Sequence, residues 1–180
     1  IQIRREKVNA RLPKIELPKF RGDPSNWQPF WDKFLAIVDE SDMSPVNKFS
    51  YLQSLLQDEA LACVAGLSLT DDNYESAKVL LQKRFGRKEK IIFSHIQKLL
   101  SISQNKSNNL WSLYDQVQAC VRSLENLGIQ GDTYGVLLTP MILHQLPSHI
   151  RLEWARSGEE KEGDLEFLLE FLFGEIQRRE

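Results

Sequence analysis

Apolar residues recur at helical spacing along most of the chain. Trp27, Trp31, Phe34 and Val38 follow one another at steps of three or four, which is the spacing of one face of an α-helix. Comparable runs lie at 45–65, 70–85, 91–100, 110–127, 134–146, 147–156 and 164–180. No segment alternates apolar and polar residues with the period of two that indicates a strand. The pattern therefore predicts an all-α fold.

Capping residues mark the expected helix ends. The starts carry residues typical of N-caps, namely Asn26, Ser44, Thr70 and Asp164. Three ends are followed by glycine, at Gly66, Gly86 and Gly128. A cap at Asn26 would put Pro29 in the first turn, where its missing N–H has no helical partner. We expect the run from Pro45 to Gly66 to be one helix.

The segment 134–146 is apolar nearly all round. A helix of this kind is typical of a buried position, so we expect it to be the central helix of its domain. Pro140 lies within the segment, removes one backbone donor and should kink the helix.

The chain divides into an arm and two helical lobes. Residues 1–20 lack helical periodicity and contain two Leu-Pro steps, which favour extended backbone. Residues 87–90 are polar and form either a linker or a solvated first turn. We therefore predict an extended arm at 1–20, an N-terminal lobe at 21–86 and a C-terminal lobe at 87–180. The apolar side chains of the arm, Leu12, Ile15, Leu17 and Phe20, could pack on the arm's own lobe or on a neighbouring copy.

Composition excludes several classes of protein. The 180 residues include 23 Lys and Arg against 25 Asp and Glu, a formal net charge of −2, so no overall basic field attracts nucleic acid. No run of about 18 apolar residues occurs, and the first 14 residues lack the apolar core of a signal peptide. We expect a soluble cytoplasmic protein without membrane contact. Cys63 and Cys120 should be buried, reduced thiols.

Catalytic and metal-binding motifs are missing from the sequence. It contains no Asp-Thr/Ser-Gly turn, no G-x-S-x-G elbow, no H-E-x-x-H helix and no glycine-rich phosphate loop. The three histidines, His95, His144 and His149, have no Cys or carboxylate cluster at ligand spacing. We predict no enzymatic activity, no metal and no cofactor.

Two kinds of surface are candidates for binding. A basic cluster occupies the predicted lobe junction and consists of Lys83, Arg84, Arg87, Lys88 and Lys90. Such a run is either a solvated face or a contact for RNA or another polyanion, whose charge would relieve repulsion between copies in a ring.

Apolar side chains provide the second candidate surface. In the last helix Phe167 and Phe171 point away from the face that carries Leu168 and Leu172. They either pack on another helix of the same lobe or contribute to self-association, as do Leu35 and Ile37 on the flanks of the first helix.

Five blocks of sequence, in order, resemble a known family. They read LPKFRGDPSNWQPFWDKF at 17–34, KFSYLQSLLQDEA at 48–60, AGLSLT at 65–70, YESAKVLLQKRFG at 74–86 and LGIQGDTYGVLLTPMILHQLP at 127–147. The chain resembles, over roughly residues 17 to 157, the Gag-like capsid segment of BEL/Pao-type LTR retrotransposons. This segment is also catalogued as a domain of unknown function beside the Pao retrotransposon peptidase.

The resemblance implies a structural role. Capsid segments of this kind fold as two helical lobes, and many copies associate into a virus-like shell around the element's RNA. The expected partner is then a second copy of the chain, in a homo-oligomer that ranges from dimer to shell, with weak polyanion contact through the basic cluster. A helical adaptor that binds an apolar peptide in a groove of the N-terminal lobe is the alternative.

Overall fold

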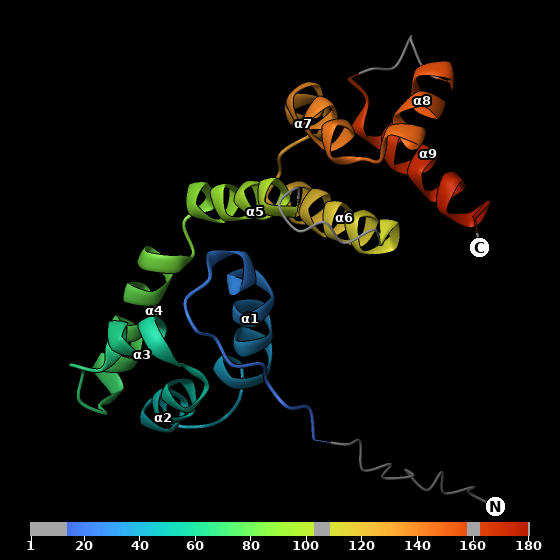
Figure 1. Ribbon diagram of the computed structural model, residues 1–180. Coiled ribbons are helices and arrows are strands. Elements are labelled where there is room, and N and C mark those ends of the chain that lie inside the picture. Colours follow the sequence, from blue (N-terminus) through green and yellow to red (C-terminus); the bar gives the residue numbers. More distant parts are fainter. Residues whose placement is uncertain (1–13, 103–108, 158–162, 180) are drawn as a thin grey trace, which may run out of the picture. The chain divides into compact units, whose positions relative to one another are not determined.

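The computed structural model describes residues 14–102, 109–157 and 163–179, and within them the chain is helical (Figure 1). The elements are η1 (Pro24–Asn26), α1 (Trp27–Phe34), η2 (Leu35–Asp39), α2 (Pro45–Leu55), α3 (Asp58–Val64), α4 (Asp71–Phe85), α5 (Lys88–Ile102), α6 (Leu110–Asn126), α7 (Gly131–Gln145), α8 (Ser148–Ser157) and α9 (Leu165–Gln177). Of these, η1 is a 3₁₀ turn and η2 a π-helical turn. The described residues contain no strand beyond one isolated bridge. The predicted all-α fold is confirmed.

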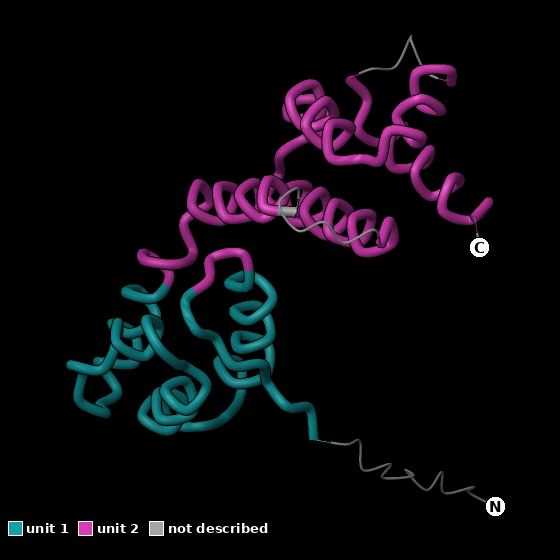
Figure 2. Tube along the Cα trace, viewed as in Figure 1, with its two compact units in different colours: residues 1–22, 26–81 teal, residues 23–25, 82–180 magenta. Residues whose placement is uncertain are grey.

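The chain forms two compact units (Figure 2). Unit 1 consists of residues 1–22 and 26–81, and unit 2 of residues 23–25 and 82–180. The division falls between Leu81 and Gln82, whereas the sequence places it at 86–90. This boundary lies inside α4, which continues without a break from Asp71 to Phe85. The polar residues 88–90 belong to the first turn of α5, one of the two alternatives for this stretch.

An aromatic cluster forms the core of unit 1. The rings of Trp27 and Trp31 stack with their centroids 4.7 Å apart, and those of Phe20 and Phe30 stack at 5.2 Å. Phe34 stacks on Trp31 at 5.5 Å and has no exposed surface. The aromatic stripe of the first helix is therefore core, because each ring is covered by another ring of the same cluster.

The end of the arm packs on its own unit. Leu17 and Phe20 are buried, whereas Ile15 is exposed. The Phe20 N–H donates to the carbonyl of Leu55 at 2.9 Å, and the Phe20 carbonyl accepts from the N–H of Gln57 at 2.9 Å. These bonds pair the chain in parallel at Phe20 and Leu56. Of the two alternatives for the arm, packing on its own lobe therefore holds for residues 17–20. Leu12 lies outside the described residues.

The prediction of a single helix from Pro45 to Gly66 is wrong. Helix α2 ends at Leu55, Leu56 is extended, and α3 begins at Asp58, whose φ is +49°. Aspartate tolerates this left-handed conformation better than most residues. The break arises because Phe20 takes the Leu55 carbonyl and the Gln57 N–H as partners. The segment itself contains no glycine or proline that would mark the break.

Three of the four predicted N-caps make the expected hydrogen bond. The side chains of Ser44, Thr70 and Asp164 accept from the backbone N–H three residues on, at 3.4, 3.2 and 3.1 Å. Asn26 precedes α1, and Pro29 lies in the first turn as expected, but the Asn26 side chain makes no capping bond. In the preceding turn, the Asp23 carboxylate accepts from the N–H of Ser25 at 2.9 Å.

A polar network joins the π-helical turn η2 to α4 within unit 1. The Asp39 carboxylate accepts a hydrogen bond from the Tyr74 hydroxyl and lies 3.0 Å from the Lys78 ammonium, and Lys48 donates to the Asp39 carbonyl. Partial burial raises the pKa of Asp39, but the bonds from Tyr74 and Lys78 outweigh burial and leave the pKa below its ordinary value. The network therefore stabilises the ionised carboxylate.

Helices α5 to α9 build the core of unit 2. Its most deeply buried side chains come from α6, α7, α8 and α9, among them Val117, Leu124, Ile150, Leu168 and Leu172. Helix α7 contacts α9 and α5. Gly135, on the buried side of α7, lies against the start of α9, and a Cβ there would meet the Gly163 carbonyl oxygen at 3.0 Å.

The prediction that the segment 134–146 is the central buried helix of its lobe holds for only one side of the helix. Tyr134, Leu138 and Ile142 of α7 are buried, whereas Val136 and Leu137 on its other side are 64% and 70% exposed. The neighbouring helices cover only one side of α7. A sequence that is apolar all round does not indicate which side this is.

The Asp39 network predicts a pH-dependent loss of stability. We expect Asp39→Asn to lower the free energy of unfolding at pH 7 by about 1–2 kcal/mol, because hydrogen bonds to a charged group are lost. The folded pKa lies below the unfolded value. The stabilisation is therefore complete above the unfolded pKa and disappears as the pH falls through the folded pKa.

Urea unfolding from pH 7 to pH 2 measures this effect. The wild type and Asp39→Asn should converge in the acid range, whereas the exposed Asp42→Asn should match the wild type throughout. A constant difference between the wild type and Asp39→Asn down to pH 2 would contradict the role of the carboxylate.

Two glycine substitutions in unit 2 should have opposite effects. Gly174→Ala in α9 should raise the free energy of unfolding by about 0.5–1 kcal/mol, since alanine favours a helix and nothing lies within 4 Å of the new Cβ. Gly135→Ala should lower it, because the new Cβ presses on the backbone at Gly163. Thermal unfolding compares them. A gain in both variants would show that the close approach of α7 to residue 163 is not constrained.

Candidate functional site

The five residues of the basic cluster lie together on the surface of unit 2. All of them are exposed. Lys83 and Arg84 are in the last turn of α4, and Lys88 and Lys90 are in the first turn of α5. Lys90 donates to the carbonyl of Arg84 at 3.1 Å. Cations are favourable at the carboxyl end of α4 but unfavourable at the amino end of α5, where the helix dipole is positive. An anion at this place would be stabilised by the five cations and by the amino end of α5, whereas the carboxyl end of α4 would oppose it.

Phe167 and Phe171 pack against Trp154 of α8. Their ring centroids lie 5.5 and 5.2 Å from that of Trp154, and both side chains are half-buried. This is the arrangement expected from packing within the same lobe, so part of each ring is already covered. Their contribution to self-association stays a prediction.

The two candidates near the first helix lie in the π-helical turn η2. Leu35 is half-buried, whereas Ile37 is 40% exposed. Both belong to unit 1. Of this pair, Ile37 has the more accessible apolar side chain.

Helix α7 presents an apolar face that the sequence did not identify. The face, called here the α7 face, consists of Val136, Leu137, Pro140 and Met141, and all four side chains are exposed. These positions follow the i, i+4 spacing of one helix side. The only signal in the sequence was the apolar character of 134–146, which could not separate covered from uncovered positions.

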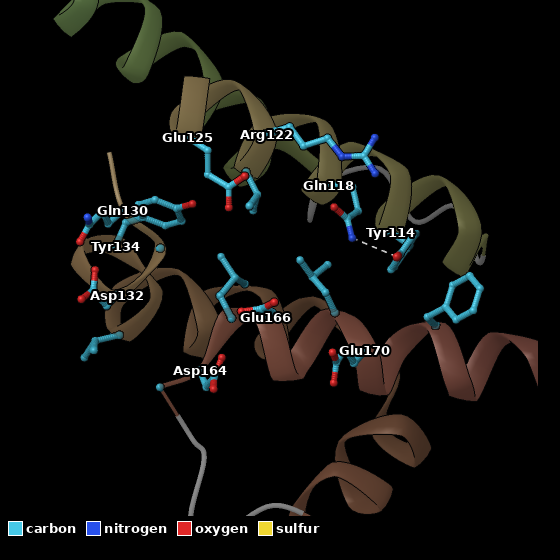
Figure 3. A pocket seen from close by; sticks show the side chains of 17 residues that line it. Tyr114, Gln118, Arg122, Glu125, Gln130, Asp132, Tyr134, Asp164, Glu166 and Glu170 are labelled. Carbon is cyan, nitrogen blue, oxygen red and sulfur yellow. Dashed lines mark hydrogen bonds between the residues drawn. The ribbon is translucent and has the colours of Figure 1, made fainter. Parts of the chain in front are cut away.

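A groove in unit 2 lies between α6, the start of α7 and α9 (Figure 3). Its volume is about 1010 Å³, at the upper end of the range for small-molecule pockets. Apolar side chains from all three helices line it, including Val121, Tyr134, Leu169 and Phe173. Charged side chains also line it, namely Arg122, Glu125, Asp132, Asp164, Glu166 and Glu170. The sequence contains no indication of this groove, because it forms only where residues 114–136 meet residues 163–173.

The Tyr134 hydroxyl is a buried polar group in this groove. Tyr134 is 8% exposed, and its hydroxyl oxygen has no hydrogen-bond partner among the described residues. Figure 3 shows the hydroxyl pointing into the space below Glu125. Burial raises the pKa of Tyr134, and the charge of Glu125 raises it further, so the hydroxyl keeps its proton. By contrast, the hydroxyl of Tyr114, on α6, accepts from the Gln118 side chain at 2.9 Å.

A second polar cluster of unit 2 is satisfied by its own contacts. The Asp23 carboxylate lies 2.9 Å from the Lys98 ammonium and accepts from the Ser94 hydroxyl at 3.0 Å. Burial raises the pKa of Asp23, but the bonds from Lys98, Ser25 and Ser94 together lower it to about 2. Since the charge of Asp23 is already compensated, the cluster is structural.

In the described part of the chain, no three His, Cys, Asp or Glu side chains are grouped closely enough to hold a metal ion. Burial raises the pKa of Cys120 to about 11, which keeps it a thiol, and Cys63 is half-buried. Among the same residues, none of the helices has the length and apolar character needed to cross a bilayer.

Comparison with known proteins identifies a family. The model of a family described as "Protein of unknown function (DUF1759)" matches residues 20–163, which include the aromatic cluster, the basic cluster and the α7 face. No curated protein and no solved structure matches the chain. Because the family match covers most of the chain, the protein belongs to the DUF1759 family of proteins of unknown function.

Proposed function

We propose that this protein is a structural domain that self-associates, in the manner of a Gag-like capsid segment of a BEL/Pao-type retrotransposon or of a domesticated derivative. The five sequence blocks that carry the resemblance support this proposal, as do the all-α fold and its two compact units. The proposed partner is a second copy of the chain.

The α7 face is the observation that carries the proposal. Val136 and Leu137 are each more than 60% exposed, on a helix whose opposite side is core. Isolated exposed apolar residues are ordinary, but four in one stripe form a patch that a partner can cover. In a closed assembly each added contact becomes effectively intramolecular. A small patch that is repeated in many copies can therefore hold the assembly together.

The basic cluster fits the same proposal. Its five exposed cations would repel one another further if copies met there, and a polyanion such as RNA would offset that repulsion. The adaptor alternative, which placed an apolar peptide in a groove of the N-terminal lobe, finds less support, because the described groove with apolar lining lies in unit 2.

Leu137→Asp should shift the protein towards monomer. A charge on the α7 face makes its burial against another copy unfavourable, whereas the exposed position of Leu137 leaves the fold intact. We expect the association constant to fall at least tenfold, measured by sedimentation over increasing concentration and followed by electron microscopy for rings or shells.

Val79→Asp is the matched control for this experiment. Val79 is 62% exposed on α4 of unit 1, so the change of side chain and the cost in helix propensity are similar. Equal association of Leu137→Asp and the wild type would contradict the role of the α7 face. A wild type that remains monomeric at millimolar concentration would refute self-association itself.

Polyphosphate or short RNA should promote association through the basic cluster. We expect either polyanion to increase the sedimentation coefficient of the wild type, and this effect to be lost in the double variant Lys83→Glu/Lys88→Glu. The effect should also weaken as salt increases, because ions screen exposed charges. The variant Lys33→Glu/Arg151→Glu makes the same change of net charge at exposed positions elsewhere. If both double variants respond alike, the effect depends on total charge and not on this cluster.

A further inference from the structure

The groove of unit 2 has a rim of carboxylates. Glu125 lies on α6, Asp132 on α7, Asp164 at the amino end of α9, and Glu166 and Glu170 on α9 (Figure 3). All five are exposed, and none forms an ion pair with another described residue. Arg122 is the one basic residue of the lining among the described residues. The groove is therefore acidic around an apolar floor, although the chain as a whole is nearly neutral.

This combination favours one class of ligand. The described carboxylates are not grouped to hold a metal ion, and nucleic acid would be repelled by them. A small cation would need only one or two of the carboxylates. Five carboxylates spread over three elements instead match a polycation that extends along the groove, and the apolar floor requires that this ligand also carry apolar side chains.

Tyr134 provides an independent indication of a ligand. A buried hydroxyl without a partner is costly, and in native structures such a group usually finds a hydrogen bond. The Tyr134 hydroxyl faces the groove next to Glu125. A backbone carbonyl or N–H of an extended peptide lying in the groove would satisfy this hydroxyl.

We propose that the groove binds the N-terminal segment, residues 1–14, of a second copy of this chain. Residues 1–13 lie outside the described part of the chain, so only their sequence bears on the match. The segment contains five basic residues and one acidic residue, Glu6; the basic residues are Arg4, Arg5, Lys7, Arg11 and Lys14. Between them lie the apolar residues Ile1, Ile3, Val8 and Leu12. The segment is thus complementary to the groove both in charge and in its need for an apolar surface.

The choice of a second copy rests on the proposed self-association. Contact of this segment with the groove of a neighbour would add to the contact through the α7 face. Val136 belongs to both surfaces, but they can be tested separately, because Leu137 lies only on the α7 face and Glu166 and Glu170 line only the groove. Binding of the segment as a free peptide tests the groove without requiring that the protein assemble.

The first experiment measures fluorescence anisotropy of a labelled peptide of residues 1–14 added to the 180-residue chain at low salt. We expect binding to the wild type and at least a tenfold loss of affinity for Glu166→Lys/Glu170→Lys. The control Asp42→Lys/Asp72→Lys makes the same charge change at exposed positions of unit 1 and should bind like the wild type. Equal binding to both double variants, or no binding to the wild type, overturns the proposal.

Two further variants test specificity. Tyr134→Phe should keep the fold, because the hydroxyl has no described partner, and should weaken peptide binding roughly two- to tenfold. A peptide with Arg4→Glu and Arg5→Glu should bind Glu166→Lys/Glu170→Lys better than it binds the wild type. If a scrambled peptide of the same composition binds the wild type equally well, the groove accepts any basic segment and the assignment to residues 1–14 is wrong.

Mixing two variants of the 180-residue chain tests whether the segment binds a second copy. Arg4→Glu/Arg5→Glu lacks the basic segment and Glu166→Lys/Glu170→Lys lacks the acidic groove, so each alone should associate less than the wild type. An equimolar mixture should recover part of the lost association in sedimentation, since the intact segment of one copy meets the intact groove of the other. No recovery, despite binding of the free peptide, would show that the segment binds within its own chain and would overturn the proposal. If both variants associate as strongly as the wild type, the proposal that the groove binds residues 1–14 is also overturned. The proposed self-association would not be contradicted by that result.

Discussion

A helix can bury only as much of its circumference as its neighbours cover, and this constraint governs the protein. Units of this size have few helices, so they bury a smaller share of their apolar surface than a large domain does. In unit 1 the constraint is met by aromatic rings that cover one another around Trp27. In unit 2 it is not met at α7, where one side enters the core and the other, with Leu137, is left exposed. The surface proposed for self-association is thus a direct consequence of how few helices surround α7.

The backbone of unit 1 shows how strongly the aromatic cluster determines its surroundings. Burial of Phe20 brings the end of the arm alongside Leu56, where its N–H and carbonyl take partners from the helical segment. Two hydrogen bonds to the arm replace helical ones, and the helix divides into α2 and α3. The polar network around Asp39 then joins η2 to α4. Burial of Phe20 thus determines the path of the chain in unit 1, and the hydrogen bonds and the ion pair of Asp39 stabilise the resulting arrangement.

Charge in unit 2 is distributed unevenly. The basic cluster at 83–90 and the acidic rim of the groove both belong to this unit, so a net charge of −2 for the whole chain conceals two surfaces of opposite sign. Exposed charges of like sign repel one another and add nothing to the stability of the fold on their own. Surfaces of this kind are typical of sites that recognise a partner of opposite charge. They suit an assembly in which several weak contacts act together.

The helical class, most helix boundaries and the caps at Ser44, Thr70 and Asp164 could be predicted from the sequence, because these depend on residues within one turn of each other. The sequence also located the basic cluster, whose members are neighbours along the chain. Three features become visible only in the folded chain: α2 and α3 are separate helices, Phe167 and Phe171 pack on Trp154, and one particular side of α7 is exposed. The acidic groove likewise exists only once α6, α7 and α9 come together. Each of these features depends on contacts between residues far apart in sequence, and local spacing carries no information about such contacts.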